Sequence, residues 1–252
     1  MSGLSDYLDE PTGQWGNPDS KTRQYMRDYT TLVVNRYKDS PAIWGWEFSN
    51  ELSLSVDLPN RREFHGETTT QQMGSRPYRD ENDDMFTDPM MEAMVEWANI
   101  VKENDPHGRM ITTGNSEPRP SQWNQYHHNS WTKDTEEQMG EIMAIHTPDP
   151  VNVASIHTYG LLERFPGSET YTGAVGAFKK AADNMSKPLF IGEFSGLDMA
   201  NSKAIIDAIV EHRVQLSACW AIGHVEHSLD NDPAVREEIF DYIKAANEAL
   251  AK

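Results

Sequence analysis

The sequence has a single cysteine, few basic residues and no long apolar run. Cys219 alone excludes an internal disulfide. With 22 Lys and Arg against 40 Asp and Glu, the formal net charge is −18, so the basic footprint of a nucleic-acid or anionic-lipid binder is absent. No stretch approaches the roughly 20 apolar residues of a membrane span. We therefore expect neither a nucleic-acid partner nor a membrane partner.

Other common protein classes are disfavoured as well. The first residues, Met1–Asp6, lack the charged and then apolar layout of a signal peptide. Gly and Pro, at 16 and 14 residues, are near their usual frequency, which argues against a disordered or fibrous chain. A length of 252 residues with 37% hydrophobic content suits one sizeable core. We expect a single globular domain over residues 1–252.

Short apolar runs alternate with helical periodicities, which is typical of βαβ units. This pattern predicts an α/β fold whose parallel strands are covered by helices, as in a (β/α) barrel. The predicted strands are 42–48, 109–114, 151–158, 188–194 and 216–222. The predicted helices are 21–38, 88–104, 135–145, 170–185, 200–213 and one opening at Asp232-Pro233.

Two of these helices carry more specific predictions. The first has an apolar face that consists of Tyr25, Tyr29, Leu32, Val33 and Tyr37. The second begins at Asp88-Pro89, which reads as an N-cap followed by proline in the first turn, and it ends at Asp105-Pro106. Its apolar stripe is Met94, Trp97, Ala98 and Val101.

Two connections, 52–86 and 115–133, are too long to be plain turns. Both follow strand ends, where barrels build their active sites. The first contains Asp80–Asp84, which lacks the ligand alternation and glycine of a calcium loop, so a solvated acidic face is expected. The second contains Trp123, Tyr126 and Trp131, which would either stack on sugar rings or pack the loop.

Two predicted strands lead to a carboxylate at their C-terminal ends, Glu51 and Glu193. In a barrel, the C-terminal ends of the strands face one common opening. Cleavage of a glycosidic bond needs such a pair, because one carboxyl protonates the leaving oxygen while the other attacks or supports the anomeric carbon. In the retaining geometry the two carboxyls stand about 5–5.5 Å apart. A capped or solvated surface charge is the structural alternative for either residue.

The segment 34–51, which ends in Trp46-Glu47-Phe48-Ser49-Asn50-Glu51, resembles glycoside hydrolases of family 5. It is most similar to the mannanase- and cellulase-related branches of these barrel enzymes. The resemblance implies that Glu51 is the acid/base and that Glu193, in Ile191-Gly192-Glu193-Phe194, is the nucleophile. It also implies four substrate-binding residues: Asn50, His157, Tyr159 and Trp220.

Each of these four residues also has a purely structural interpretation. Asn50 would cap a turn, His157 and Trp220 would belong to the core, and Tyr159 is ambiguous without the resemblance. Cys219 reads as a small buried filler. His224-Val225-Glu226-His227 does not have the spacing of the helical zinc motif. We therefore expect no metal and no cofactor.

The resemblance covers essentially the whole chain, but only strands four to eight of the family barrel have counterparts. Strands one to three, with an arginine that family members carry near the nucleophile, have none. A five-stranded arc leaves two open edges. The chain is then a fragment or abbreviated product, an arc with rearranged segments, or part of a homo-oligomer whose copies cover the open sides. We expect the homo-oligomer.

The resemblance implies hydrolysis of a β-linked polysaccharide or oligosaccharide, with activity weakened if part of the cleft is missing. Two alternatives belong to other classes. One is a non-catalytic sugar-binding or assembly protein, and the other is a metal-dependent hydrolase on the same scaffold. Secretion would be consistent with the resemblance, although the sequence leaves the cellular location unknown. Sugar identity depends on loops and is not predicted.

Overall fold

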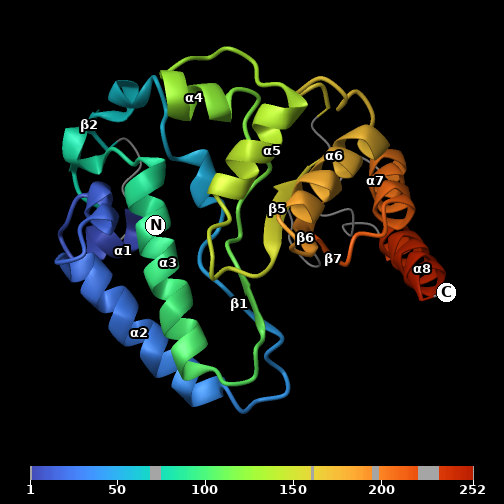
Figure 1. The fold of residues 1–252 in the computed structure, drawn as a ribbon, viewed down its shortest axis with the longest axis horizontal. Helices are drawn as coiled ribbons and strands as arrows, with labels where there is room; N and C mark the ends of the chain where they lie inside the picture. The colour runs from blue at the N-terminus through green and yellow to red at the C-terminus, as the bar shows by residue number, and fades with distance from the viewer. Residues whose placement is uncertain (1, 69–74, 160–161, 195–198, 221–232, 252) are drawn as a thin grey trace.

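The computed structural model describes residues 2–68, 75–159, 162–194, 199–220 and 233–251. Five parallel strands form its centre, and each lies within one of the five predicted runs (Figure 1). They are β1 (Gly45–Glu47), β4 (Met110–Thr112), β5 (Ala154–Thr158), β6 (Leu189–Phe194) and β7 (Leu216–Cys219). The predicted strands are therefore confirmed.

The strands follow one another in chain order. β1 pairs with β4, and β5, β6 and β7 pair in turn, all in parallel. The two groups meet where the backbone N–H groups of Asn152 and Val153 donate to the carbonyl of Ile111, at 3.1 and 3.2 Å. Among the described residues, β1 has no second strand partner on its outer edge. The described strands thus make an arc.

The six predicted helices are present, and the described chain has two more, Ser2–Tyr7 and Gln122–His128. In chain order the helices are α1 (Ser2–Tyr7), α2 (Lys21–Tyr37), α3 (Thr87–Asn104), α4 (Gln122–His128), α5 (Glu136–Ile145), α6 (Tyr171–Asn184), α7 (Met199–Glu211) and α8 (Pro233–Leu250). The α5 helix opens with a capping box, in which Thr135 and Gln138 exchange hydrogen bonds. None of the described helices is long and apolar enough to cross a membrane.

The connection 52–86 contains short elements. These are three 3₁₀ turns, η2 (Leu52–Leu54), η3 (Arg61–Phe64) and η4 (Glu81–Asp83), and a small antiparallel hairpin of β2 (Gly66–Glu67) and β3 (Tyr78–Arg79). A further 3₁₀ turn, η1 (Thr12–Gly16), precedes α2.

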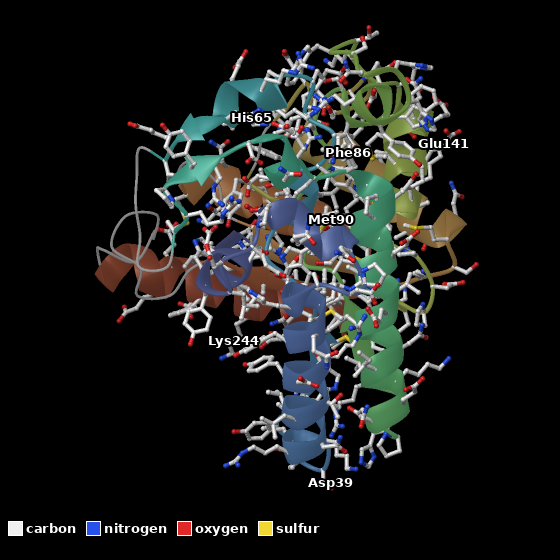
Figure 2. All side chains as sticks on the ribbon, turned by 90° about the vertical axis from the view of Figure 1, so that its left-hand side faces the viewer. Asp39, His65, Phe86, Met90, Glu141 and Lys244 are labelled. Carbon is white, nitrogen blue, oxygen red and sulfur yellow. The ribbon has the colours of Figure 1, made fainter. Side chains whose placement is uncertain are left out.

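Two hydrophobic clusters support the arc at its two ends. In the first, α3 packs beside α2 (Figure 2), and Ile111 of β4 belongs to the same cluster. The predicted α3 stripe is confirmed, because its four side chains are buried. The second cluster joins α5, α6, α7 and α8 to β5 and β6, with Phe178, Leu189 and Ile191 almost fully buried. Each fully buried side chain of this size contributes about 1.5–3 kcal/mol.

The apolar face predicted for α2 turns out to be exposed. Tyr25, Tyr29, Leu32 and Tyr37 each expose 42–67% of their surface, whereas Met26 and Val34 are buried. A groove of ≈ 630 Å³ runs between this face and β1, lined mainly by Tyr25, Tyr29, Val33, Trp46 and Phe48. The helix therefore has apolar side chains on two sides. The described residues bury the side with Met26 and Val34 and leave the tyrosine side exposed.

The predicted N-cap of α3 was wrong. The helix begins at Thr87, and the cap comes from a distant residue, Asp57. Its buried carboxylate accepts hydrogen bonds from the backbone N–H and the hydroxyl of Thr87. Asp88 instead accepts a hydrogen bond from the hydroxyl of Tyr126. A tertiary contact therefore replaced the local cap that Asp88-Pro89 predicted.

The acidic run 80–84 is not the solvated face that we expected. Asp83 accepts hydrogen bonds from Arg76 and Arg79, and its side chain is only 8% exposed. Asp84 pairs with Arg61 and His65. These basic residues lie within the same connection, so the charges neutralise one another locally and fasten the loop.

Candidate active site

Glu51 lies beyond the end of β1, where the ladder to the β4 side continues past the regular strand. The backbone N–H of Ser49 donates to Thr113 O, and that of Glu51 donates to Gly114 O at 2.7 Å. Glu51 itself has φ 54° and ψ 33°, in the left-handed region. A non-glycine residue there costs of order 1–3 kcal/mol and persists only when its surroundings hold it.

Gly114 makes this approach possible. Its φ is +69°, and a Cβ at this position would lie 1.9 Å from the carbonyl oxygen of Ser49. A larger residue would push apart the two chain segments that the Glu51 hydrogen bond joins. The glycine at the end of the predicted strand therefore has a positional role in the site.

Arg119 holds the turn that follows Glu51. Its guanidinium donates to the carbonyls of Ser53 and Val56, both at 2.7 Å, and to the side chain of Gln125. Burial lowers the pKa of Arg119 to about 10. Two contacts thus fix the left-handed conformation of Glu51. Gly114 accepts a hydrogen bond from its backbone N–H, and Arg119 binds the carbonyls of the turn that follows it.

Glu193 and His157 are brought together by the register of β5 and β6. His157 stands opposite Glu193 across a register shift in the parallel ladder. Gly192 leaves room for the imidazole, since a Cβ there would lie 3.0 Å from His157 Nε2. The side chain of His157 is 2% exposed and that of Glu193 is 14% exposed.

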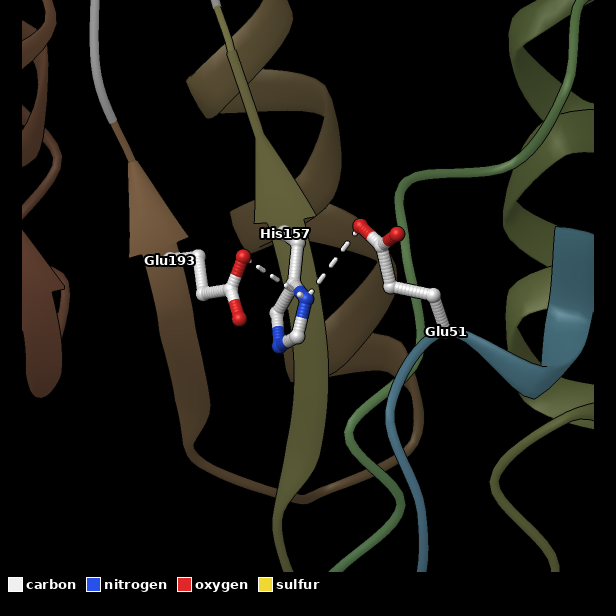
Figure 3. Close-up of side chains that lie close together, drawn as sticks. All are labelled: Glu51, His157 and Glu193. Atoms are coloured by element: carbon white, nitrogen blue, oxygen red, sulfur yellow. Dashed lines mark ion pairs between the residues drawn. The ribbon is translucent and has the colours of Figure 1, made fainter. Parts of the chain in front are cut away.

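The three side chains converge on one point at the C-terminal ends of their strands (Figure 3). His157 Nδ1 lies 3.3 Å from Glu51 Oε1 and 3.5 Å from Glu193 Oε2. The three atoms all lie within 4.8 Å of one another. The two carboxylates therefore face each other across one opening, although 142 positions separate them (193 − 51).

Tyr159, the fourth predicted residue at this point, donates its hydroxyl hydrogen bond to Glu193 Oε2. Burial and this hydrogen bond, with the nearby carboxylates, raise the pKa of Tyr159 well above its usual range. The phenol therefore stays protonated and fixes one oxygen of Glu193. Among the described residues, neither Glu51 nor Glu193 forms an ion pair with lysine or arginine.

The other two predicted residues lie at the edges of this opening. Asn50 is exposed and borders both the groove beside β1 and a second pocket of ≈ 470 Å³ that includes Glu51 and Arg61. Trp220 directly follows β7, is 38% exposed, and its backbone N–H donates to Phe194 O at 2.9 Å. The adjacent Cys219 is only partly buried and packs against the second cluster.

The aromatic residues of the second long connection have structural contacts. Trp123 Nε1 donates to Glu141 Oε2 at 2.8 Å, and Tyr126 donates to Asp88. Trp131 is 57% exposed. Loop packing thus accounts for Trp123 and Tyr126. The run 224–227 lies outside the described residues.

Two further carboxylates lie close to the site. Glu47 lies on β1 and is exposed. Partial desolvation raises its pKa; the nearby His157 opposes this rise, and the charge of Glu193 adds to it. Glu117 is 3% exposed, with its oxygens held by Thr158 at 2.7 Å and Arg164 at 3.2 Å. Burial raises its pKa to about 7.

Sequence reasoning missed Glu117, although a signal was available. It follows the strand 109–114 within three residues, just as Glu51 follows its own strand. Its backbone N–H donates to His157 O at 2.9 Å, so it reaches the same end of the sheet.

The family follows from the whole sequence rather than from this geometry alone. The model of "Cellulase (glycosyl hydrolase family 5)" matches residues 9–225. This chain belongs to glycosyl hydrolase family 5. The resemblance stated from residues 34–51 is therefore confirmed, and the chain is a glycoside hydrolase by family.

Solved structures of family 5 enzymes share the fold. The endo-1,4-β-mannanase from Rhizomucor miehei aligns with a TM-score of 0.64 and 14% identity, covering 97% of this chain and 68% of its own. The endo-1,4-β-D-mannanase from Thermotoga petrophila gives 0.59 and 14%, covering 93% and 63%. Endoglucanase Cel5A from Thermotoga maritima gives 0.51 and 14%, covering 91% and 68%. No curated protein matches the chain.

These family 5 barrels are longer than this chain, which spans about two thirds of the length of the two mannanases. At 14% identity the likeness concerns the fold alone.

Proposed function

We propose that this family 5 chain cleaves β-linked polysaccharide or oligosaccharide by the retaining, double-displacement route. The observation that carries the proposal is the approach of the Glu51 and Glu193 carboxylates to within 4.8 Å. Retaining enzymes hold their two carboxyls about 5–5.5 Å apart, whereas inverting enzymes need about 6.5–9.5 Å to admit a water.

In the proposed first step, Glu51 protonates the glycosidic oxygen while Glu193 attacks the anomeric carbon. The bond to the leaving sugar breaks, and a covalent glycosyl ester forms on Glu193. In the second step Glu51 takes a proton from water, the water oxygen attacks the anomeric carbon, and the ester bond breaks. The Tyr159 hydroxyl aims one oxygen of Glu193 and leaves the other for the attack.

The proposed substrate contacts come from the strand ends beside these carboxylates. Asn50 precedes Glu51 directly and would hydrogen-bond the hydroxyl beside the anomeric carbon. Trp220 would lie under the sugar ring, because the flat indole suits the apolar face of a pyranose. His157, which lies beside both carboxylates, would contact the sugar bound between them.

The choice of polymer rests on the related structures. Two of them are described as endo-1,4-β-mannanases and one as an endoglucanase. We propose a β-1,4-linked mannan or glucan as the substrate class. We also propose that the five strands correspond to strands four to eight of the family barrel. The other three strands would then lie beside the open edge of β1.

Hydrolysis of chromogenic aryl β-mannosides and β-glucosides tests the proposal directly. We expect slow but measurable turnover by the parent and a loss of at least about a thousandfold in Glu193→Ala, since a nucleophile acts in every turnover. Glu92→Ala is the matched control, because Glu92 is an exposed glutamate on α3, away from the site. Its turnover should equal that of the parent.

The stereochemistry of the first product decides the mechanism. Proton NMR during early hydrolysis should show the β-anomer, which is retention, while an α-anomer would contradict the proposed role of Glu193. If no variant or parent hydrolyses any glycoside and mannotriose still binds, the sugar-binding alternative replaces hydrolysis.

A further inference from the structure

Three potential metal ligands meet at the candidate active site. One oxygen of Glu51, Nδ1 of His157 and one oxygen of Glu193 lie within 4.8 Å of one another. In the part of the chain that the structure describes, no other three His, Cys, Asp or Glu residues come together in this way. They reach the site from three separate segments, the turn after β1, β5 and β6 (Figure 3).

His157 supplies an independent indication of a ligand. Its side chain is 2% exposed, and its Nδ1 makes no hydrogen bond although it faces both carboxylates. A buried nitrogen without a hydrogen bond costs of order 1–3 kcal/mol. A cation held between Nδ1 and the two carboxylates would satisfy the nitrogen and neutralise the paired negative charges.

The distances suit a small tetrahedral ion. Zinc binds histidine nitrogen at about 2.0–2.1 Å and carboxylate oxygen at about 2.0–2.2 Å, so neighbouring ligands of a tetrahedral zinc stand about 3.3–3.6 Å apart. Nδ1 lies 3.3 Å from the Glu51 oxygen and 3.5 Å from the Glu193 oxygen. The third distance, between the Glu51 and Glu193 oxygens, is within 4.8 Å. The Glu51 side chain is 24% exposed, and its rotation would shorten this distance.

The ligand types select the class of ion. Imidazole nitrogen suits zinc, copper and nickel, whereas magnesium and calcium prefer sites made of oxygen alone. Two carboxylates and one neutral histidine leave a fourth position for water. The net charge of −18 also favours the approach of cations.

We propose that Glu51, His157 and Glu193 bind a divalent transition-metal ion, with Zn²⁺ the best fit, and that the bound ion blocks glycoside hydrolysis. The second half rests on the proposed function of the same site. An ion held between the two carboxylates occupies the space that the anomeric carbon needs, and a metal-bound Glu51 carries no proton to donate. The ion and the sugar therefore exclude each other.

Calorimetric titration of ZnCl₂ into the chelator-treated full chain measures binding without reference to activity. We expect one strong site per chain, weakened at least about tenfold in His157→Ala and in Glu193→Gln, because each removes one ligand. His127→Ala is the matched control, since His127 is an exposed histidine on α4. It should bind Zn²⁺ like the parent, and MgCl₂ should give no comparable heat.

Glu193→Gln is the second variant because it disturbs the fold less than His157→Ala does. Glu193 is less buried than His157, and glutamine has nearly the same shape as glutamate. Circular dichroism should match the parent for both variants. Zinc should also raise KM for the aryl glycoside without lowering kcat, and EDTA should reverse the effect.

The two proposals fail in different ways. Zinc affinity unchanged in both His157→Ala and Glu193→Gln, or lost in His127→Ala, would overturn the metal site even if hydrolysis is normal. Tight zinc binding that needs His157 and Glu193, with no glycoside turnover by the metal-free chain, would uphold the metal site and remove the proposed hydrolysis.

Discussion

At the scale of single residues, Glu117 is a buried carboxyl group near the site whose pKa is strongly raised. It is buried beside Thr158 and Arg164, and burial raises its pKa to about 7 from an ordinary value of 4.5. Arg164 and the Thr158 hydroxyl counteract this rise, and the charge of Glu51 adds to it. The folded protein therefore binds the Glu117 proton more tightly than the unfolded chain does.

This raised pKa predicts a pH-dependent stability. The stabilising effect of the proton is complete below about pH 4.5 and disappears as the pH rises through about 7. Between these limits the free energy of unfolding of the parent should fall, relative to Glu117→Gln, by up to about 3 kcal/mol. Urea unfolding of both proteins at several pH values measures the difference, and parallel curves would contradict the prediction.

The comparison with Glu117→Gln is needed because His146 has the opposite effect. His146 is fully buried, and burial lowers its pKa from 6.5 to about 3. It stays neutral in the folded protein, so its contribution to stability is present above about pH 6.5 and is lost as the pH falls towards 3. In the parent alone the two groups partly cancel between pH 4.5 and 6.5.

At the scale of elements, the start of α3 depends on a residue 30 positions earlier in the chain. Asp57 accepts from both the N–H and the hydroxyl of Thr87, and the Thr87 hydroxyl also contacts His146 Nε2 at 2.9 Å. The loop after Glu51 is thereby attached to the helix that supports β4. The stability of α3 and the position of the turn that carries Glu51 are coupled through this contact.

Asp57→Ala should destabilise the protein by about 2 kcal/mol, because it leaves two buried donors of Thr87 without their acceptor. Asp88→Ala, at the cap position that the sequence suggests, should cost less than about 0.5 kcal/mol, since Asp88 is exposed. Thermal and urea unfolding distinguish the two variants. Equal losses would mean that the helix is capped locally after all.

At the scale of the whole molecule, the outer edge of β1 and the exposed side of α2 form one apolar surface. Trp44 is 75% exposed, and the groove of ≈ 630 Å³ separates the α2 tyrosines from Trp46 and Phe48. An unpaired strand edge beside exposed aromatic side chains is a surface that other chains tend to cover. The homo-oligomer predicted from the sequence stays a prediction, and this surface is where we expect its contact.

Tyr29→Glu places a charge in the centre of that surface, since Tyr29 is 56% exposed and stacks on Tyr25. Sedimentation velocity at micromolar concentration should show the parent associated and Tyr29→Glu largely monomeric. Tyr78→Glu is the control, because Tyr78 is 57% exposed on the β2–β3 hairpin, away from the groove. A parent that sediments as a folded monomer would contradict the prediction.

Much of the architecture could be predicted because it depends on local patterns. Apolar runs bounded by polar turns located all five strands, and the alternation of apolar runs with helical periodicity located α2, α5 and α6 to within about two residues. The strand-end positions of Glu51 and Glu193, with the family motif, were enough to predict that these two carboxylates share one opening. These features are local because burial on a strand and the hydrogen bonds of a helix turn involve neighbouring residues.

The tertiary structure decided the features that involve residues far apart in the chain. Only the register of β5 and β6 sets His157 opposite Glu193, and only the β1–β4 ladder with Arg119 turns Glu51 towards them. The Asp57 cap, the buried Glu117 and the exposed side of α2 likewise depend on which segments pack together. By itself the sequence determined which carboxylates stand at strand ends, where we propose the chemistry. Long-range packing determined how far apart they stand, because a distance between strands is not encoded within either strand.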